Sequence, residues 1–252
     1  MRIIPLSEGS YTIDRSKEFV PFNKHFDDLQ ERPIGSLLVE IQPFVVETTS
    51  DIILMDCGLG FCDAKGVMNI HFNLMQHQID PSQVTKVLLS HLHKDHAGGA
   101  LKFDVHLQQY SLSFPNATYY INRNEMHYAL EENQSASYQS EKLTVLQNSN
   151  QVVLLDDIGS IDQYIKYQVT GAHSKFHQVF WIEEEGDIIF YGGDDAPQLK
   201  QMKVKFVAKY DFDGTKSMTL RNAWWQKGKM DNWTFLFYHD IQTPTFSDCL
   251  SS

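Results

Sequence analysis

Cysteine and long apolar runs are scarce in this sequence, and each absence argues against a class of protein. The three cysteines, Cys57, Cys62 and Cys249, form no C-x-x-C pair, which favours free thiols over the disulfide framework of small secreted proteins. The longest apolar runs, such as residues 52–55 and 152–155, are too short to cross a bilayer. The N-terminal residues lack the apolar core and cleavage site of a secretion signal. We therefore predict a cytoplasmic protein.

Basic residues are also few relative to acidic ones. The chain has 32 acidic and 21 basic residues, which gives a formal net charge of −11. A nucleic-acid-binding protein normally concentrates basic side chains on one face, because phosphate contacts dominate its affinity. The most basic stretch, residues 199–209, has amphipathic spacing that is typical of a solvated helix face. We predict a small-molecule substrate and neither a nucleic-acid nor a membrane partner; the sequence carries no signal of oligomeric state.

No Pro/Gly/Ser-rich linker and no low-complexity segment divides the 252 residues. Apolar residues make up 42% of the chain and charged residues 21%, which is the composition of a folded protein with a sizeable core. A chain of this length can form one large domain or two small ones. Because no segment separates two parts, we expect residues 1–252 to form a single domain.

Two β-rich blocks of the sequence echo each other. Residues 36–60 read as two strands around a turn, and residues 164–195 read as strands around two turns. Both blocks end with Asp-Ile-Ile, two more residues and then a turn of glycine and aspartate. Short β-rich blocks that are each followed by helical stretches suggest two similar α/β halves.

The rest of the chain alternates strand and helix patterns. Asp80 and Pro81 have the residue types of a helix start, and Asn122 and Glu125 have the spacing of a capping box. The polar stretch 134–150 predicts a loop with a short helix. The other expected elements are strands at 85–90, 117–121 and 233–240, and helices at 122–133, 198–209 and 215–229.

A cluster of metal-ligand residues follows the strand at 85–90. In "SHLHKDHAGG", the side chains of His91, His93, Asp95 and His96 fall within six positions. Residues i and i+2 of an extended chain project to the same side, so the first two histidines can converge on one ion. A catalytic zinc usually takes three protein ligands and leaves one position for water. Four candidate ligands exceed the need of one such site, and the cluster therefore indicates a pair of metals.

Further ligand residues follow other predicted strands. His173 comes after a strand in "TGAHSKFH", Asp194 after two glycines in "FYGGDDAP", and His239 at the end of "FLFYHD". Glycine allows the close backbone approach that a crowded metal centre requires. Because α/β folds build sites at strand ends, we expect these side chains to join the first cluster.

These motifs resemble those of the metallo-β-lactamase superfamily, in the family's order and over roughly residues 36 to 240. The resemblance implies an α/β fold, a four-layer αβ/βα sandwich of two mixed β-sheets flanked by helices. "HLHKDHAGG" matches the superfamily's H-x-H-x-D-H motif in full. The other matching segments are the strand end "DCGLG" (56–60), the third-histidine segment "TGAHSKFH" (170–177), the bridging "GGD" (192–194) and the final "YHD" (238–240).

The resemblance also assigns roles to the candidate residues. It implies that His91, His93 and His173 hold one metal ion. It further implies that Asp95, His96 and His239 hold a second ion, that Asp194 bridges the two, and that Asp56 lies behind the ligands and orients them. The implied cofactors are two divalent metal ions, zinc first, although this nitrogen and oxygen ligand set also accepts iron or manganese.

The activity implied by the resemblance is metal-dependent hydrolysis. A hydroxide held between the two ions would attack an ester-type bond of a small molecule, and Asp95 would carry the proton to the leaving group. The lactonase-like group, that of the N-acyl homoserine lactone hydrolases, resembles this chain in motif and length. Those enzymes often place a tyrosine three residues beyond the bridging aspartate, where this chain has Pro197. A phosphoester or thioester hydrolase is the alternative, followed by a non-catalytic metal-binding protein.

Several neighbouring residues have simpler interpretations. Asp195 reads as a turn or helix-capping residue, His177 as a packing or hydrogen-bonding residue, and Cys57 as a small buried residue. Trp224 and Trp225 read as the core and rim of a C-terminal helix, with a pocket wall as the alternative.

Overall fold

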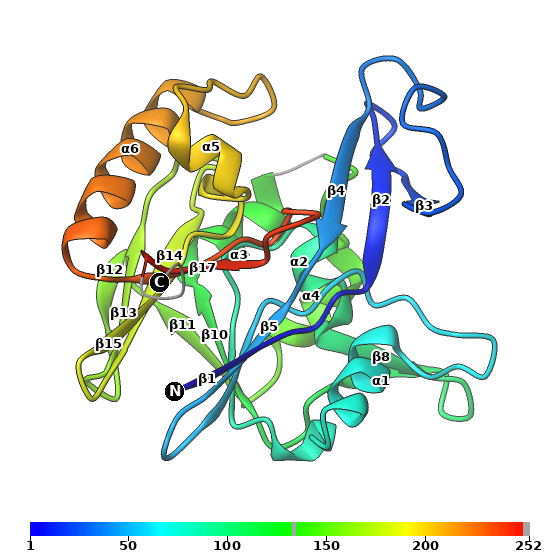
Figure 1. The fold of residues 1–252 in the computed structure, drawn as a ribbon. Helices are drawn as coiled ribbons and strands as arrows, with labels where there is room; N and C mark the ends of the chain where they lie inside the picture. Colours follow the sequence, from blue (N-terminus) through cyan, green and yellow to red (C-terminus); the bar gives the residue numbers. More distant parts are fainter. Residues whose placement is uncertain (133–134, 249–252) are drawn as a thin grey trace.

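The computed structural model describes residues 1–132 and 135–248, so Cys249 lies outside the described residues. Two six-stranded sheets form the centre of the fold (Figure 1). The first sheet has the order β1 (Arg2–Pro5), β5 (Phe44–Glu47), β6 (Ile52–Met55), β7 (Lys86–Leu88), β10 (Thr118–Asn122) and β11 (Val152–Leu155). The second has the order β12 (Ile158–Ile161), β13 (Ile165–Val169), β14 (Gln178–Glu184), β15 (Asp187–Tyr191), β16 (Thr234–Leu236) and β17 (Thr245–Phe246).

Smaller elements complete the described chain. A three-stranded sheet has the order β3 (Phe19–Phe22), β2 (Gly9–Ile13), β4 (Leu37–Ile41), and a hairpin pairs β8 (Leu101–Asp104) with β9 (Gln109–Leu112). The α-helices are α1 (Asn69–Gln76), α2 (Lys94–Ala97), α3 (Arg123–His127), α4 (Ser140–Gln147), α5 (Leu199–Lys203) and α6 (Gly214–Met230). Single turns of other helix types are η1 (Pro81–Gln83), η2 (Gly98–Ala100), η3 (Tyr128–Glu132) and η4 (Gly193–Asp195).

Side-chain alternation along the central strands creates the layers. In β6, Ile53 and Met55 face the second sheet, whereas Leu54 faces the helices α1, α3 and α4. In β15, Ile189 and Tyr191 face the first sheet, whereas Phe190 packs under α5 and α6. Successive residues of a strand point to opposite faces, so both faces of each sheet are buried. The predicted four-layer αβ/βα sandwich of mixed sheets is confirmed.

The echo between the two β-rich blocks corresponds to equivalent positions in the two sheets. Strand β6 pairs antiparallel with β5 and parallel with β7. Strand β15 likewise pairs antiparallel with β14 and parallel with β16. The two Asp-Ile-Ile segments therefore lead into the strand at the same place in each half, where an antiparallel hairpin meets a parallel neighbour.

Four predicted elements are shorter than the sequence suggests. The strand expected over 85–90 spans only Lys86–Leu88, and the α-helix expected over 122–133 ends at His127, where η3 follows; position 133 lies outside the described residues. The helix expected over 198–209 ends at Lys203, and Val204 is extended, with φ −128° and ψ 153°. The strand expected over 233–240 ends at Leu236, although Phe237 N still donates to Pro244 O at 2.8 Å. After Leu236 the buried Phe237, Tyr238 and His239 lead into the centre of the molecule.

Helix capping is confirmed in part. The Asn122 side chain accepts hydrogen bonds from the N–H groups of Asn124 and Glu125, as an N-cap does. The reciprocal half of the capping box is wrong, because the buried Glu125 carboxylate accepts from Leu92 N at 3.0 Å and from the hydroxyl of Tyr138 at 3.2 Å. Glu125 thus fixes the segment that carries the first two histidines.

The segment after Asp80 forms only the single turn η1, closed by a capping box with Gln83, and it does not continue as a helix. Trp224 and Trp225 lie on α6 and belong to the core, as predicted, with ring centroids 5.0 Å from Phe190 and 5.3 Å from Phe235 respectively. Aromatic rings of this size bury a large apolar area and hold the helix to the sheet.

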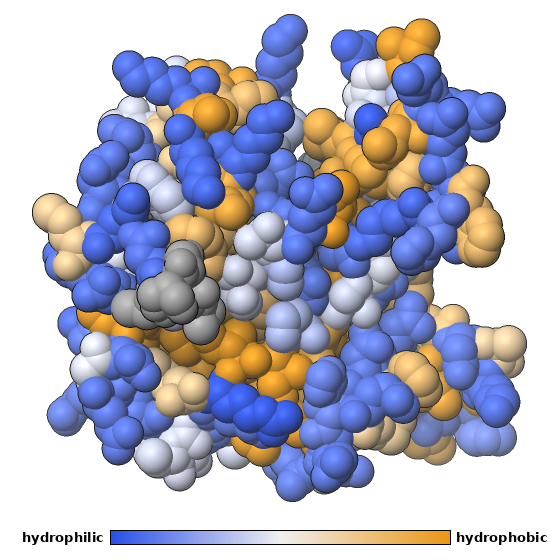
Figure 2. Space-filling view, viewed as in Figure 1, coloured by the Kyte–Doolittle hydropathy of each residue, from blue (hydrophilic) through white to orange (hydrophobic). Residues whose placement is uncertain are grey.

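Two projections rise from one end of the sandwich. One is the sheet of β2, β3 and β4, and the other is the connection between α5 and α6 (Figure 1). Figure 2 shows the surface notched between them, with apolar side chains on the first projection. The segment from β3 to β4 contains the exposed Val20, Leu29 and Ile34. Within the described ranges, no helix is both long and apolar enough to span a bilayer.

Candidate metal centre

The structure places every predicted site residue after a strand of the two central sheets. Parallel neighbours β6 and β7 end at the same edge, as do β15 and β16. The loops that follow these strands meet between the two sheets. The residues come from five loops: Asp56 follows β6, the segment from His91 to His96 follows β7, His173 follows β13, Asp194 follows β15, and His239 follows β16.

Four of these side chains form a first group that could hold a metal ion: His91, His93, His173 and Asp194. Nδ1 of His93 lies 2.8 Å from Nε2 of His91 and 3.3 Å from Nε2 of His173. Nε2 of His173 lies 3.2 Å from Oδ2 of Asp194. His93 is the N-cap residue of α2, with an extended backbone, so its ring turns toward that of His91.

The second group consists of Asp95, His96 and His239. Oδ2 of Asp95 lies 3.7 Å from Nε2 of His96 and 3.6 Å from Nε2 of His239. Oδ1 of Asp194 lies 3.1 Å and 2.9 Å from the same two nitrogens. One carboxylate therefore contacts both groups, one oxygen facing each.

In three imidazoles, Nδ1 is the ring nitrogen that points away from the centre. Each of these outer nitrogens contacts a group that can only accept a hydrogen bond. Nδ1 of His96 lies 2.7 Å from an Asp56 oxygen, and Nδ1 of His239 lies 2.7 Å from the backbone oxygen of Glu40. Nδ1 of His173 lies 3.0 Å from Oδ1 of Asp211. Each Nδ1 must therefore carry the proton, and Nε2 of the neutral ring keeps its lone pair for the interior.

Nδ1 of His91 also contacts a hydrogen-bond acceptor, which here is the oxygen of a serine hydroxyl. Oγ of Ser90 donates to Oδ2 of Asp56 at 2.7 Å. Because its only proton is used there, the same oxygen accepts from Nδ1 of His91, 3.0 Å away. The Nε2 atom of His91 is thus also an unprotonated nitrogen that faces the centre.

Two buried polar atoms in the centre have no hydrogen-bond partner among the described residues. They are Nε2 of His96 and Oδ1 of Asp194, which lie close together without hydrogen-bond geometry. A lone pair and a carboxylate oxygen that face each other in the interior are costly unless a cation lies between them. The donor set of imidazole nitrogens and carboxylates fits divalent zinc, iron or manganese.

Charge balance in the centre depends on the carboxylates. Burial lowers the pKa of His91 and of His93 well below the ordinary value for histidine, with help from neighbouring imidazoles. Burial alone would also lower the pKa of His96, but Asp194, Asp95 and Asp56 outweigh it and raise that pKa well above the ordinary value. In the first group, Asp194 and Asp211 likewise outweigh burial and raise the pKa of His173. Carboxylates therefore favour positive charge in both groups.

Asp56 is fully buried and contacts three elements at once. In addition to His96, it accepts the backbone N–H of Ser90 at 2.7 Å and the hydroxyl of Tyr191 at 2.5 Å. Its backbone has φ +55°, a left-handed conformation that places the carboxylate beneath the ligand loops. Tyr191, three residues before Asp194, is a contact that the sequence gave no sign of.

Asp195 lies in the turn η4, as predicted, but its side chain is buried rather than solvent-facing. Its carboxylate accepts the backbone N–H of His173 at 2.6 Å and also the hydroxyl of Thr170. His177 is confirmed as a hydrogen-bonding residue, because its Nε2 accepts the N–H of Asp194 at 3.1 Å; its Nδ1 lies 3.1 Å from an oxygen of Asp195. Asp195 and His177 together therefore connect the third-histidine loop to the turn that carries Asp194.

Asp211 was not predicted from the sequence, and it lies beside the site. It comes from the connection between α5 and α6, beyond the end of the helix expected over 198–209, and its carboxyl side chain is 1% exposed. No strand precedes it, so the strand-end signal that identifies the other residues is missing here. The polar stretch "KYDFDG" (209–214) gives no other indication of proximity to His173.

The sequence matches the family described as the Metallo-beta-lactamase superfamily over residues 41–239. This match covers most of the chain. The chain belongs to the metallo-β-lactamase superfamily. The matched span includes every residue of the candidate metal centre from Asp56 to His239. No curated protein matches the sequence.

Several solved structures share the fold at low sequence identity. A probable metal-dependent hydrolase from Staphylococcus aureus has a TM-score of 0.75 and 21% identity, over 98% of this chain and 91% of its own. AidC, a dizinc quorum-quenching lactonase in complex with a product, has a TM-score of 0.71 and 18% identity, over 96% and 88%. The hydrolase AbOPH has a TM-score of 0.72 and 21% identity, over 97% and 89%.

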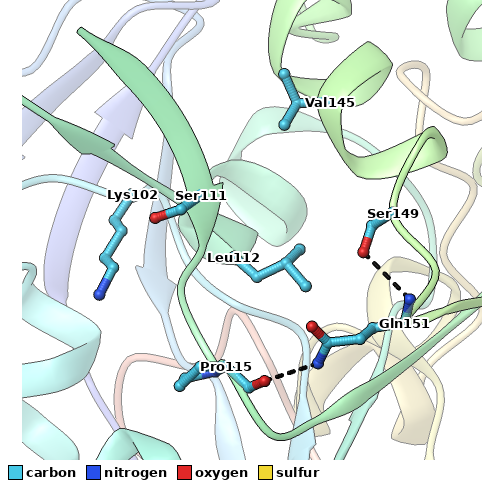
Figure 3. Close-up of a pocket in the computed structure, with 7 residues that line it drawn as sticks. All are labelled: Lys102, Ser111, Leu112, Pro115, Val145, Ser149 and Gln151. Atoms are coloured by element: carbon cyan, nitrogen blue, oxygen red, sulfur yellow. Dashed lines mark hydrogen bonds between the residues drawn. The ribbon is translucent and has the colours of Figure 1, made fainter. Parts of the chain in front are cut away.

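A surface cavity of about 480 Å³ lies away from the metal centre of this superfamily member (Figure 3). Gln151 spans it, donating to Pro115 O at 2.9 Å and, through its backbone, to Ser149 Oγ at 3.2 Å (Figure 3). The cavity has no titratable group apart from Lys102 and no metal-ligand residue. We assign it no part in the chemistry of the centre.

Proposed function

We propose that this protein uses two divalent metal ions, zinc first, to hydrolyse an ester-type bond of a small molecule, with a lactone as the leading substrate. Membership of the metallo-β-lactamase superfamily indicates a metal-dependent hydrolase. The observation that carries the proposal is the position of Asp194, whose two oxygens face the two ligand groups. A structural zinc site is usually closed by four ligands and does not need a second group.

In this proposal the contacts described above assign each side chain to one of the two ions. The first ion is held by His91, His93 and His173, the second by Asp95, His96 and His239, with Asp194 between them. Asp56 orients His96 through its Nδ1 proton, 2.7 Å from the carboxylate.

Two cations in these positions would supply Lewis acidity, lowering the pKa of a water molecule to about 7 and polarising the substrate oxygen. The chain supplies the proton transfer. The Asp95 side chain is only 12% exposed, lies within 3.7 Å of two imidazole nitrogens and has its backbone oxygen fixed by the Tyr238 hydroxyl. A carboxylate held at this point can move a proton from the attacking water to the leaving group.

A lactone substrate is favoured by the similarity of the fold to that of two lactone hydrolases whose structures hold the product, N-hexanoyl-L-homoserine. The residue three positions beyond Asp194 is Pro197, whose backbone oxygen accepts the N–H of His239 at 3.0 Å. This position therefore offers no side-chain hydroxyl to a substrate. A phosphoester or thioester hydrolase is the alternative enzyme, and a metal-binding protein without catalysis is the alternative of another class.

The test is a substrate panel of lactones, esters, thioesters and phosphoesters with the zinc-loaded protein. We expect lactone turnover that is abolished by chelation and restored by zinc. The His93→Ala and Asp194→Ala variants should lose at least 10³-fold in kcat/KM while their circular dichroism spectra remain unchanged.

His106→Ala is the matched control, because His106 is exposed and lies outside both groups. Its kinetics should equal those of the wild type. Turnover of phosphoesters alone would replace lactone by the alternative substrate. Unchanged turnover in the two variants, or bound zinc without turnover of any substrate, would reject the catalytic proposal.

A further inference from the structure

One phenol beside the metal centre is used by none of the roles given above. Tyr210 lies on the connection between α5 and α6, and its ring centroid is 6.2 Å from that of His173, in an edge-on arrangement. Two backbone hydrogen bonds hold this connection to the third-histidine loop, from Phe212 N to His173 O at 2.9 Å and from Asp213 N to Ala172 O at 2.8 Å. The phenol is therefore placed by a fixed backbone.

A buried arginine holds the same connection from its other end. The guanidinium of Arg221 on α6 donates to Phe206 O at 2.6 Å and to Asp195 O at 3.0 Å. The Arg221 residue is only 1% exposed. Because Asp195 also binds the third-histidine loop, the segment with Tyr210 and the turn with Asp194 share one rigid support.

The hydroxyl of Tyr210 has a defined hydrogen-bond direction. Nε2 of Gln201 donates to it at 3.4 Å, and the same amide contacts Oε1 of Gln198 at 3.3 Å. A phenol that accepts one hydrogen bond still has its own proton to donate. No acceptor for that proton is found among residues 1–132 and 135–248.

The phenol is protonated at neutral pH and accessible. Burial raises the pKa of Tyr210 to about 12, and the nearby charge of Asp194 also acts in that direction. The residue as a whole is nevertheless 39% exposed, so a bound molecule can reach it. The contact of its ring with the ring of His173 places this neutral O–H donor beside the first ligand group.

We propose that Tyr210, presented by Gln201, donates its phenolic hydrogen to the oxygen of the substrate's scissile carbonyl group and stabilises the negative charge that develops there. This role rests on the proposed hydrolytic function. The carbonyl oxygen gains charge as water adds to the carbon, and a fixed donor stabilises that charge more than it stabilises the ground state. Tyr210 would then contact substrate and act as a catalytic residue.

The experiment compares Tyr210→Phe with the wild type in zinc-loaded protein. We expect kcat and kcat/KM for the lactone γ-butyrolactone to fall together by roughly 10²-fold, the loss typical of one oxyanion donor. Binding of 4-hydroxybutyrate, the carboxylate product, is measured by calorimetry, and we expect its Kd to rise about tenfold, since one hydrogen bond is worth roughly one power of ten. Zinc content should stay at the wild-type value.

Tyr110→Phe is the matched control, because Tyr110 lies on β9, in the hairpin away from the centre. It should change neither readout. Unchanged kinetics and an unchanged Kd in Tyr210→Phe would overturn the proposal. So would a loss of activity in proportion to lost zinc, because that would show a merely structural role.

The two readouts separate this inference from the proposed function. If wild-type protein hydrolyses no lactone but Tyr210→Phe still weakens 4-hydroxybutyrate binding, the donor role stands and the lactone assignment fails. If lactone turnover is present and insensitive to Tyr210→Phe, the lactone assignment stands and the donor role fails.

Discussion

At the scale of single residues, the ability of the centre to bind metal depends on the hydrogen-bond acceptors behind the imidazoles as well as on the imidazoles themselves. Acceptors on the outer nitrogens of His96, His173 and His239 leave the inner nitrogens free of protons. Asp211 is the least expected of these acceptors, since it comes from an irregular connection rather than from a strand end.

Removing the acceptor behind His173 should weaken the first ion site selectively. In Asp211→Asn the amide can turn its NH₂ group toward Nδ1 and favour the wrong tautomer of the ring. Loss of such an outer partner typically costs 10–100-fold in metal affinity, and we expect that range for one of two zinc ions. Competition with a chromophoric chelator measures it, with the exposed Asp187→Asn as control; equal affinities in all three proteins would contradict this role.

A second buried carboxyl group predicts how stability depends on pH. Burial raises the pKa of Glu8 from 4.5 to about 7, although the N–H groups of Leu59 and Ile70 partly oppose this. The folded state therefore binds the proton more tightly than the unfolded state. The stabilisation is complete below pH 4.5 and is lost as the pH rises toward 7, a change of about 3 kcal/mol in the free energy of unfolding.

The Glu8→Gln variant removes this ionisation while keeping the shape of the side chain. Urea unfolding at pH 5 and pH 7.5 should show a smaller decrease in stability for the variant than for the wild type, by about 2 kcal/mol, since part of the titration lies below pH 5. Glu31→Gln, at an exposed position, should behave like the wild type. The same pH dependence in all three proteins would mean that Glu8 is not the group that titrates.

At the scale of elements, two loops under the metal centre touch backbone to backbone. The N–H of Cys57 donates to His96 O at 2.6 Å, and that of Gly99 donates to Gly58 O at 3.1 Å. A Cβ atom at Gly99 would lie 2.0 Å from the backbone oxygen of Cys57. The two glycines of "HAGG" are therefore required by packing, which fixes the loop of the second ligand group against the loop of Asp56.

Gly99→Ala should accordingly destabilise the fold. Neither loop can move without displacing the other, so we expect a loss of about 3 kcal/mol and a decrease in Tm of roughly 10 °C. The control is Gly66→Asn, since the position has φ +79° and no neighbour within 4 Å, and asparagine tolerates that conformation. A wild-type Tm for Gly99→Ala in calorimetry would show that the loops are not tightly apposed.

The elements also show where sequence patterns are informative and where they are not. Strands with short apolar runs, such as β6 and β15, and the capped start of α3 were predictable because their signals are local. The end of α5 was not, because residues 204–209 keep the amphipathic spacing of a helix but lie in a loop that is held by Arg221 and by the third-histidine loop. Tertiary contacts outweigh propensity there.

At the scale of the whole molecule, the centre lies where two similar halves meet. The strand-end signal led to all seven ligand candidates, because parallel strands bring their following loops to a common edge. Asp211, behind His173, and Tyr210, beside it, carry no such signal, since their proximity to the centre depends on the path of one irregular connection. The cytoplasmic location and the single-domain layout stay predictions.

The most direct test of the account is anomalous X-ray diffraction at the zinc edge from crystals of the zinc-loaded protein. The account predicts two peaks per chain. One would lie among His91, His93 and His173, the other among Asp95, His96 and His239, with an oxygen of Asp194 beside each. No peak between these side chains, or a single peak bound elsewhere, would contradict it.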